Sequence, residues 1–495
     1  MPTVIPPTKN IVVDGILRYP LTGIKVLIVG AGVAGAFTAI ECWRKGHDVE
    51  IIEKAPKFSA AGDLVGVGPS AWATLRNYPT MLKEYVEIGM ESDQCFYLFD
   101  GTKIAGPVEI EYARPHVAPH AAYPLRTQPV FGRNELCAML LRQCERLNIP
   151  ITWGADIVDY EDDPAAEYPK AIAADGKTYH GDVIIAADGI GTKSHKLTLG
   201  RPVVAKDTGY TCYRVMFPVS QLKTAPILSE VLKKNGRPEM RAYTGDNIHC
   251  ILAITERNIT LAVTVLEEHV DRGNVKESWR STASSNDVLK AVGNTEGWDP
   301  ILLEAIRNTP DQSIIRWKLC MRDPQPKWVS DNGRLLQVGD AAHSFLPTSG
   351  NGACTAMEDA LSVPECLRLG GGKEGASMAL KVHQFLRYRR TTLIQRTGFE
   401  NRRLLHMKTD SKEINWDEGI FRTGKWHWGH NSEKYATENF EKARAHLESG
   451  APFEHTNLPP GHKFEEWTLE GEMAKEQTGV NLAADLRLNG DWGVL

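Results

Sequence analysis

Three closely spaced glycines are the first residues of this chain whose spacing points to chemistry. They stand in the run Gly30-Ala-Gly32-Val33-Ala34-Gly35, between an apolar stretch and a helical pattern. In such a turn the first glycine lets the chain reverse, the second lets a pyrophosphate approach the backbone, and the third lets a helix pack closely on a strand. The N–H groups at the start of the helix then face the anion. The run therefore predicts a dinucleotide site.

An acidic residue supports this prediction. Glu53 ends the next apolar run, 23 residues after Gly30. A carboxylate at this position can accept hydrogen bonds from both hydroxyls of a ribose, and it would repel a 2′-phosphate. The pair favours an unphosphorylated adenosine, as in FAD or NAD.

Two more apolar runs end in an aspartate beside a glycine. Asp188 and Gly189 follow one run, and Gly339 and Asp340 follow the other. The second pair is followed by the glycine-containing run Pro347-Thr-Ser-Gly350-Asn351-Gly352. A dehydrogenase that binds only NAD needs neither pair, so the three motifs together favour FAD.

The elements that must position these motifs can be read from the apolar pattern. Residues 25–29 and 49–53 are predicted strands with a helix between them, which implies a parallel pair joined by a right-handed crossover. Strand-like runs at 210–219, 249–255 and 260–266 predict a separate antiparallel sheet. We expect an α/β fold with a discontinuous Rossmann-like FAD-binding domain, an antiparallel or mixed β-sheet substrate domain and a C-terminal helical region.

Domain boundaries follow from the same pattern. We expect an N-terminal arm over 1–22, an FAD-binding domain from 23–92, 125–198 and 324–372, a substrate-binding sheet domain from 93–124 and 199–323, and a C-terminal helical region and tail over 373–495.

Composition excludes several classes of protein. The 57 basic and 62 acidic residues give a net charge of −5, which argues against nucleic acid as the main partner. The nine cysteines form no CxxC pair and predict buried thiols in a reducing compartment. No signal peptide, membrane anchor or metal-ligand spacing is evident. We expect a cytoplasmic monomer or homodimer without a metal.

The three motifs, in this order, resemble those of the class A, single-component FAD-dependent aromatic hydroxylases. The chain is most similar to the salicylate-hydroxylase-like branch of fungal natural-product pathways, over roughly residues 24–400. The resemblance implies FAD as cofactor and NADPH or NADH as co-substrate. It also implies that one oxygen atom of O₂ passes, through a C4a-hydroperoxyflavin, to a hydrophobic aromatic or alkene-containing substrate by hydroxylation, dearomatisation or epoxidation.

The resemblance also implies site residues. Arg133 would lie near the ribityl–pyrophosphate part of FAD, and Asp340 would accept a hydrogen bond from a ribityl hydroxyl. The loop Pro347–Gly352 would cover the isoalloxazine ring. The helix after this loop would aim N–H groups at the flavin N1 and C2 carbonyl. The family pattern also assigns further residues to the cofactor, namely Lys54, Gly62, Asp188 and Gly189.

On the substrate side, the first strand of the sheet domain carries Arg214, which could bind a substrate oxygen. Asp63 could pair with Arg214 or act as a proton donor or acceptor. A structural ion pair or a loop cap is the alternative for both residues. Tyr213 and Tyr243 are weaker pocket candidates, and packing is the better interpretation of each.

Departures from the family pattern leave alternatives open. Thr192 and His195 replace a serine and an arginine after Asp188-Gly189, which leaves the choice between NADH and NADPH open. Ala253-Ile254 stands where relatives that hydroxylate phenols carry Tyr-Pro. A flavin oxidase or dehydrogenase on the same fold remains an alternative, as does an FAD-holding scaffold for a non-redox cyclisation. A flavin halogenase is disfavoured because its WxWxIP signature is absent.

Overall fold

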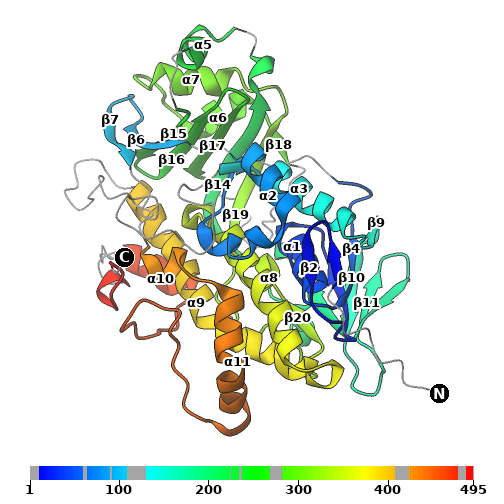
Figure 1. Ribbon diagram of the computed structural model, residues 1–495. Coiled ribbons are helices and arrows are strands. Elements are labelled where there is room, and N and C mark those ends of the chain that lie inside the picture. Colours follow the sequence, from blue (N-terminus) through cyan, green and yellow to red (C-terminus); the bar gives the residue numbers. More distant parts are fainter. Residues whose placement is uncertain are drawn as a thin grey trace.

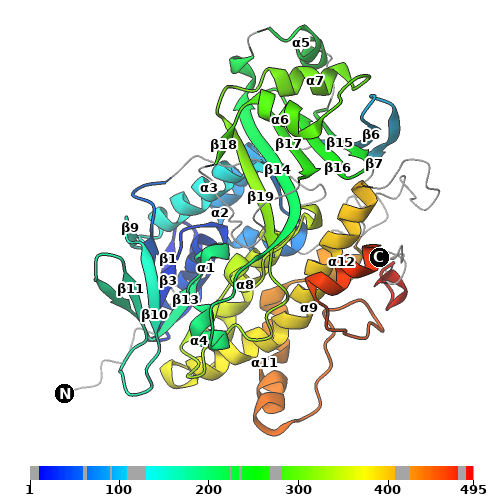
Figure 2. The same ribbon diagram turned by 180° about the vertical axis from the view of Figure 1, so that it is seen from behind.

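The computed structural model describes residues 11–58, 64–89, 92–108, 130–222, 224–233, 237–267, 281–406, 423–477 and 486–493. Two sheets dominate it (Figure 1). The larger sheet and the helices α5–α7 lie at one end of the molecule, and a smaller parallel sheet lies at the other. Helices α8, α9 and α11 lie beside the parallel sheet, and both views place the end of α9 beneath the larger sheet (Figure 2). This arrangement confirms the predicted α/β class.

The parallel sheet has five strands around the predicted strand–helix–strand unit. Its order is β20 (Leu335–Gln337), β13 (Val183–Ala186), β3 (Lys25–Val29), β4 (Asp48–Glu53) and β9 (Ile151–Trp153). Alternate residues of β3 face opposite sides, so Val26 and Ile28 contact one core and Leu27 and Val29 another. Because both faces are covered, the two central strands β3 and β13 are apolar apart from Lys25.

Helices cover one face of this sheet and a small sheet covers the other. The helices are α1 (Val33–Arg44), α3 (Arg133–Arg146) and α8 (Gly352–Leu369), and α2 (Pro79–Ile88) packs on α3. The small sheet has the order β10 (Ile157–Glu161), β11 (Lys170–Ala173) and β12 (Thr178–His180). Two strand pairs complete this part of the fold, β1 (Ile11–Val13) with β2 (Ile16–Arg18) and β5 (Leu64–Gly66) with β8 (Val130–Gly132).

The larger sheet has eight strands. Its order is β18 (Thr282–Ala283), β19 (Ile314–Met321), β14 (Lys206–Pro218), β17 (Asn258–Leu266), β16 (Ile248–Ile254), β15 (Glu239–Gly245), β6 (Asp93–Leu98) and β7 (Lys103–Val108). It is a mixed sheet, because β15 and β6 are parallel and the other pairs are antiparallel. One face packs on α5 (Pro226–Lys233), α6 (Ser285–Val292) and α7 (Pro300–Arg307).

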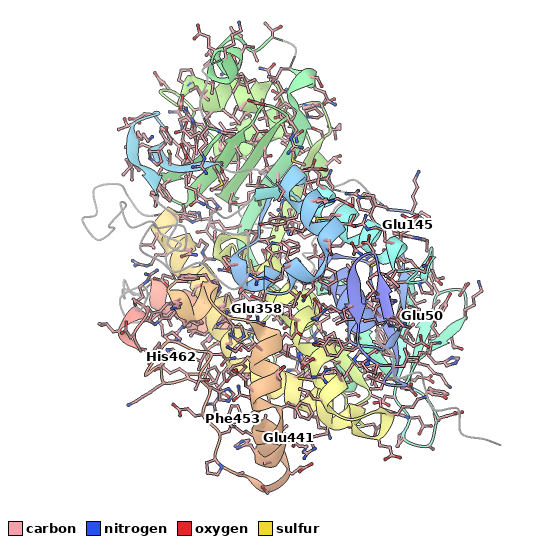
Figure 3. All side chains as sticks on the ribbon, viewed as in Figure 1. Glu50, Glu145, Glu358, Glu441, Phe453 and His462 are labelled. Carbon is pink, nitrogen blue, oxygen red and sulfur yellow. The ribbon has the colours of Figure 1, made fainter. Side chains whose placement is uncertain are left out.

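The C-terminal part of the chain packs on α8. Helix α9 (Ala376–Leu405) crosses α8 and is followed by α10 (Lys425–Trp428), α11 (Ser432–Ser449) and α12 (Leu469–Gln477). The structure buries Arg387 and Arg390 of α9 against carboxylates of α8. Figure 3 shows one of these, Glu358, in the interior among the helices.

The other sequence expectations concern cysteines, metals and membranes. All nine cysteines are buried free thiols. The described residues contain no group of three or more His, Cys, Asp or Glu side chains that could hold a metal. None of the helices in the described ranges combines the length and the apolarity needed to cross a bilayer.

Candidate functional site

The glycine turn between β3 and α1 has no room for side chains at two of its three glycines. Gly30 has φ +107°, and a Cβ atom there would lie 2.4 Å from the carbonyl oxygen of Ala187. A Cβ atom at Gly35 would lie 1.9 Å from the carbonyl oxygen of Gly30. A Cβ atom at Gly32, the N-cap of α1, would meet no described atom within 4 Å. The turn therefore leaves open space at the start of α1, where the free N–H groups of the helix favour an anion.

Glu53 is held beside this turn by backbone hydrogen bonds. Its Oε2 accepts from the N–H of Ala31 and its Oε1 from the N–H of Ala55, each at 2.8 Å. A carboxylate has about four acceptor positions, so both oxygens can also accept from ribose hydroxyls. Lys54 beside it is exposed, whereas Val33 and Ala34 are half-buried at the start of α1.

The Asp188-Gly189 turn follows β13 and adjoins the glycine turn. The Tyr160 hydroxyl donates to Oδ2 of Asp188 at 2.7 Å, while Oδ1 is buried and has no hydrogen-bond partner within the described part of the chain. Burial raises the pKa of the Asp188 carboxyl, which opposes its ionisation. A buried acceptor without a donor is costly to the fold, and a bound ligand could satisfy it. Sequence reasoning missed Tyr160, since nothing local to β10 links it to this turn.

The Gly339-Asp340 turn follows β20, the neighbour of β13 in the parallel sheet. A Cβ atom at Gly339 would be 3.0 Å from the Cβ atom of Ala34, so this motif and the glycine turn are in contact. The side chain of Asp340 is exposed. Desolvation by the surrounding protein nevertheless raises the pKa of its carboxyl, against the opposing charges of His343, Arg133 and Arg322. Exposure and desolvation coincide when a side chain lies in a recess of the protein.

Arg322, which the sequence analysis did not select, joins the two aspartate turns. This buried residue directly follows β19, and its guanidinium donates to the carbonyl oxygens of Ile190 and Asp340. It also affects His195, whose pKa falls to about 4 through burial and the Arg322 charge. Both ring nitrogens of His195 are buried without a hydrogen-bond partner in the described residues. No sequence motif marks Arg322, because the turns that it joins are more than a hundred residues apart.

The loop Pro347–Gly352 leads directly into α8. Gly350 adopts φ +64°, and the side-chain amide of Asn351 donates to the carbonyl oxygen of Ser349 at 2.6 Å. Helix α9 supports the loop, because Thr348 donates to the carbonyl oxygen of Gly398 at 2.7 Å. The first N–H groups of α8 are therefore held in a fixed turn. They favour negative charge beside the loop.

On the larger sheet the structure separates the predicted substrate residues. Tyr213 and Tyr243 are buried in the core against α5–α7, and their hydroxyls donate to Glu267 at 2.6 Å and Asp299 at 2.7 Å. Both tyrosines face the helical layer, which agrees with packing as the better interpretation of each. Arg214 follows Tyr213 in β14, so it lies on the opposite face, where it is half-buried. Gly62 and Asp63 lie outside the described residues, and the hypotheses for them stay predictions.

The geometry fits FAD. The open start of α1 suits its pyrophosphate, and Glu53 suits the adenosine ribose. The unpaired Oδ1 of Asp188 and the exposed Asp340 beside Arg133 supply further polar groups. The start of α8 suits the electron-rich end of the flavin ring. These groups come from distant segments of the chain and lie around the start of α1.

Comparisons with known proteins agree with this fit. The model of the FAD binding domain family matches residues 23–369. The chain is 35% identical over 485 residues to the FAD-dependent monooxygenase fsr3 of Gibberella fujikuroi, covering 96% of this chain and 91% of that protein. Its structure resembles that of CtdE in complex with FAD and substrate 4, at 26% identity and a TM-score of 0.75, covering 86% of this chain and 99% of that one.

A salicylate hydroxylase substrate complex shares the fold at 22% identity and a TM-score of 0.63, covering 84% of this chain and 98% of that one. The family match, the curated relative and the two solved structures confirm the resemblance found in the sequence. With its cofactor-binding motifs in contact around one helix start, the chain belongs to the family of FAD-dependent monooxygenases.

Proposed function

We propose that this enzyme uses NADPH or NADH to insert one oxygen atom of O₂ into an electron-rich aromatic or alkene-containing intermediate of fungal secondary metabolism. The nicotinamide supplies two electrons and the second oxygen atom leaves as water, so that substrate, O₂, NAD(P)H and a proton give oxygenated product, water and NAD(P)⁺. The observation that carries the proposal is the position of Arg214 on the sheet face opposite α5–α7, the face on which α9 lies.

Helix α9 links this sheet face to the cofactor loop. Asn401 donates to the carbonyl oxygen of Thr348 at 3.0 Å, and three and four residues later Leu404 and Leu405 at the end of α9 pack against the larger sheet. FAD, when bound, supplies the redox chemistry that reduces and activates O₂. The chain contributes position and charge: N–H groups of α8 stabilise negative charge at the loop, and Arg214 orients an oxygen of the substrate.

Asp63 completes the substrate side of the proposal. A carboxylate near Arg214 would pair with the guanidinium or transfer a proton at the substrate oxygen. Asp63→Asn should then change the pH profile of product formation, or the product distribution, while FAD stays bound. Wild-type behaviour in both measurements would leave Asp63 as a loop residue.

The first test is the reduction of the bound flavin. The purified yellow protein is incubated anaerobically for a long period with NADPH and, separately, with NADH, and its visible absorbance is followed. We expect one donor to bleach the protein and air to restore the colour. A protein that stays oxidised with both donors contradicts the use of a nicotinamide. Gly32→Val, which should not retain FAD, is the control for absorbance unrelated to the cofactor.

A second measurement separates the proposal from an oxidase. In the presence of substrate, a monooxygenase couples donor consumption to oxygenated product, whereas an oxidase releases hydrogen peroxide instead. Incorporation of labelled oxygen from ¹⁸O₂ into the product supports the proposal. Stoichiometric peroxide without labelled product contradicts it.

A further inference from the structure

Three residues from three central strands form a partly exposed row across the larger sheet. Arg214 of β14 is paired with Ala262 of β17, and Ala262 is paired with Ile251 of β16. All three are partly exposed although their strands lie in the middle of the sheet. We name these three residues the open row. In the next row along the strands, the corresponding residues Cys212, Thr264 and His249 are all buried.

The open row faces the cofactor side of the molecule. The alternate residues Tyr213 and Val263 face the core at α5–α7, so the open row points the other way. Met216, two residues beyond Arg214 on the same face, closely approaches Gly132, since a Cβ atom there would be 2.6 Å from its Cε. Gly132 immediately precedes Arg133 of the cofactor site.

The opposite end of the open row meets α9. Leu404 and Leu405 of α9 belong to the small apolar cluster against which Ile251 packs. The same helix supports the loop Pro347–Gly352 through Gly398. The open row therefore lies between the α3 start, which carries Arg133, and the helix that holds the flavin loop.

The side chains of the open row differ in size and charge. Adjacent strands are about 4.8 Å apart, so the row spans about 10 Å from Arg214 to Ile251. Ala262 has only a methyl group between a guanidinium and a branched apolar side chain. The side chain in the middle of the row is therefore the shortest, the one at one end is cationic, and the one at the other end is apolar. A guanidinium binds carboxylate or phenolate oxygens and stacks on aromatic rings.

We propose that Ala262 leaves the space for the second ring of the substrate, which is a planar aromatic of at least two fused rings with an acidic oxygen. The oxygen, a carboxylate or an ionised phenol, contacts Arg214, and the second ring lies over Ala262 toward Ile251. The inference rests on the proposed function, because it takes the open row as the substrate side of the flavin. The methyl group of Ala262 selects for ring number through the space that it leaves.

The test compares two probes of the same chemistry and different size. Salicylate has one ring and 1-hydroxy-2-naphthoate has two, and each is titrated into the oxidised holoenzyme while the visible spectrum of the flavin is recorded. We expect the wild type to bind the naphthoate more tightly. Ala262→Phe should weaken naphthoate binding about tenfold or more and leave salicylate binding unchanged. Arg214→Met should weaken both probes more than about tenfold.

Two further variants make the result specific. Leu266→Phe introduces the same ring at an exposed position on the same strand. This variant should bind both probes with the affinity of the wild type. Ala262→Val fills the site less and should weaken naphthoate binding to a smaller extent. It also serves if the phenylalanine variant fails to fold. FAD content and bleaching by the nicotinamide should be those of the wild type in Leu266→Phe.

Wild-type naphthoate binding by folded Ala262→Phe would overturn the inference, as would equal losses of both probes. A wild type whose flavin spectrum responds to neither probe would overturn the substrate class. Bleaching by NADPH or NADH in that same protein would leave the proposed function standing. Alternatively, the protein binds the probes with the expected size dependence and is never reduced by NADPH or NADH. That result would support the inference on Ala262 and contradict the proposed function.

Discussion

Gly30, Gly32 and Gly35 have different roles within one turn. A side chain at Gly30 or Gly35 would collide with backbone carbonyl oxygens, whereas Gly32 borders open space. The first and third glycines are therefore required by the fold. The middle glycine is required only by the close approach of a ligand to the start of α1.

This difference gives a prediction at the residue scale. Gly32→Val should change the free energy of unfolding of the apoprotein by about 1 kcal/mol or less, because Gly32 is an N-cap with free space. It should nevertheless abolish FAD retention. Gly35→Val should destabilise the apoprotein by more than about 4 kcal/mol, because its side chain meets a carbonyl oxygen. Urea unfolding and the flavin-to-protein absorbance ratio measure both effects. A fully yellow Gly32→Val protein would refute the assignment of the pyrophosphate site.

Individual side chains show how far the sequence predicts the site. The glycine and aspartate motifs are local, so their turns can be located without a structure. Arg322 and Tyr160 act on those turns from distant segments, and no local pattern reveals a contact of that kind. Tyr213 and Arg214 are neighbours on one strand, yet only one can face the substrate. Choosing between them requires knowing which sheet face the helices α5–α7 cover.

At the scale of elements, α8 and α9 are joined through buried charges. Arg387 donates to Glu358 and Asp359, and Arg390 donates to both oxygens of Glu358 at 2.9 Å. The two arginines hold the pKa of the Glu358 carboxyl well below its usual range, although burial opposes this. Arg390 also donates to the carbonyl oxygens of Trp426, His427 and Asn457. The C-terminal segments are thus bonded to the helix that begins at the loop Pro347–Gly352.

Substitution of two adjacent arginines of α9 tests whether the buried charges stabilise the contact between α8 and α9. Arg390→Met should lower the free energy of unfolding by about 3–5 kcal/mol, because Glu358 would remain buried with one arginine fewer. Arg389 is exposed and lies over the ring of Phe464, so Arg389→Met should cost less than about 1 kcal/mol. Urea denaturation of the holoenzymes measures both. Similar stabilities for the two variants would show that the buried charges do not join the helices.

At the scale of the whole molecule, buried histidines make stability depend on pH. Burial lowers the pKa of several of them, among others to about 4 for His47 and His195 and to about 3 for His249, His383 and His427. In the unfolded chain a histidine takes up its proton near pH 6.5. Between about pH 6.5 and about pH 4 the unfolded state therefore binds more protons than the folded state, and stability falls as the pH falls.

We expect the holoenzyme to lose stability between about pH 6.5 and about pH 4, by up to about 1.4 kcal/mol per pH unit for each such histidine. Urea midpoints measured across this range test the prediction. His383→Gln removes one titrating group from the interior and should make the dependence less steep. His180→Gln alters an exposed histidine and should leave it unchanged. Equal midpoints at about pH 7 and about pH 5 would contradict the expected effect.

Because every cysteine is buried, the reactivity of the thiols reports local unfolding of the surrounding structure. A thiol reagent can modify a cysteine only when the surrounding structure exposes it. The thiols are divided between the two halves of the molecule, with Cys42 and Cys366 in helices beside the parallel sheet and Cys212 and Cys250 in the larger sheet. Peptide mapping of modified thiols over time would therefore show which half of the molecule unfolds locally first, without an engineered label.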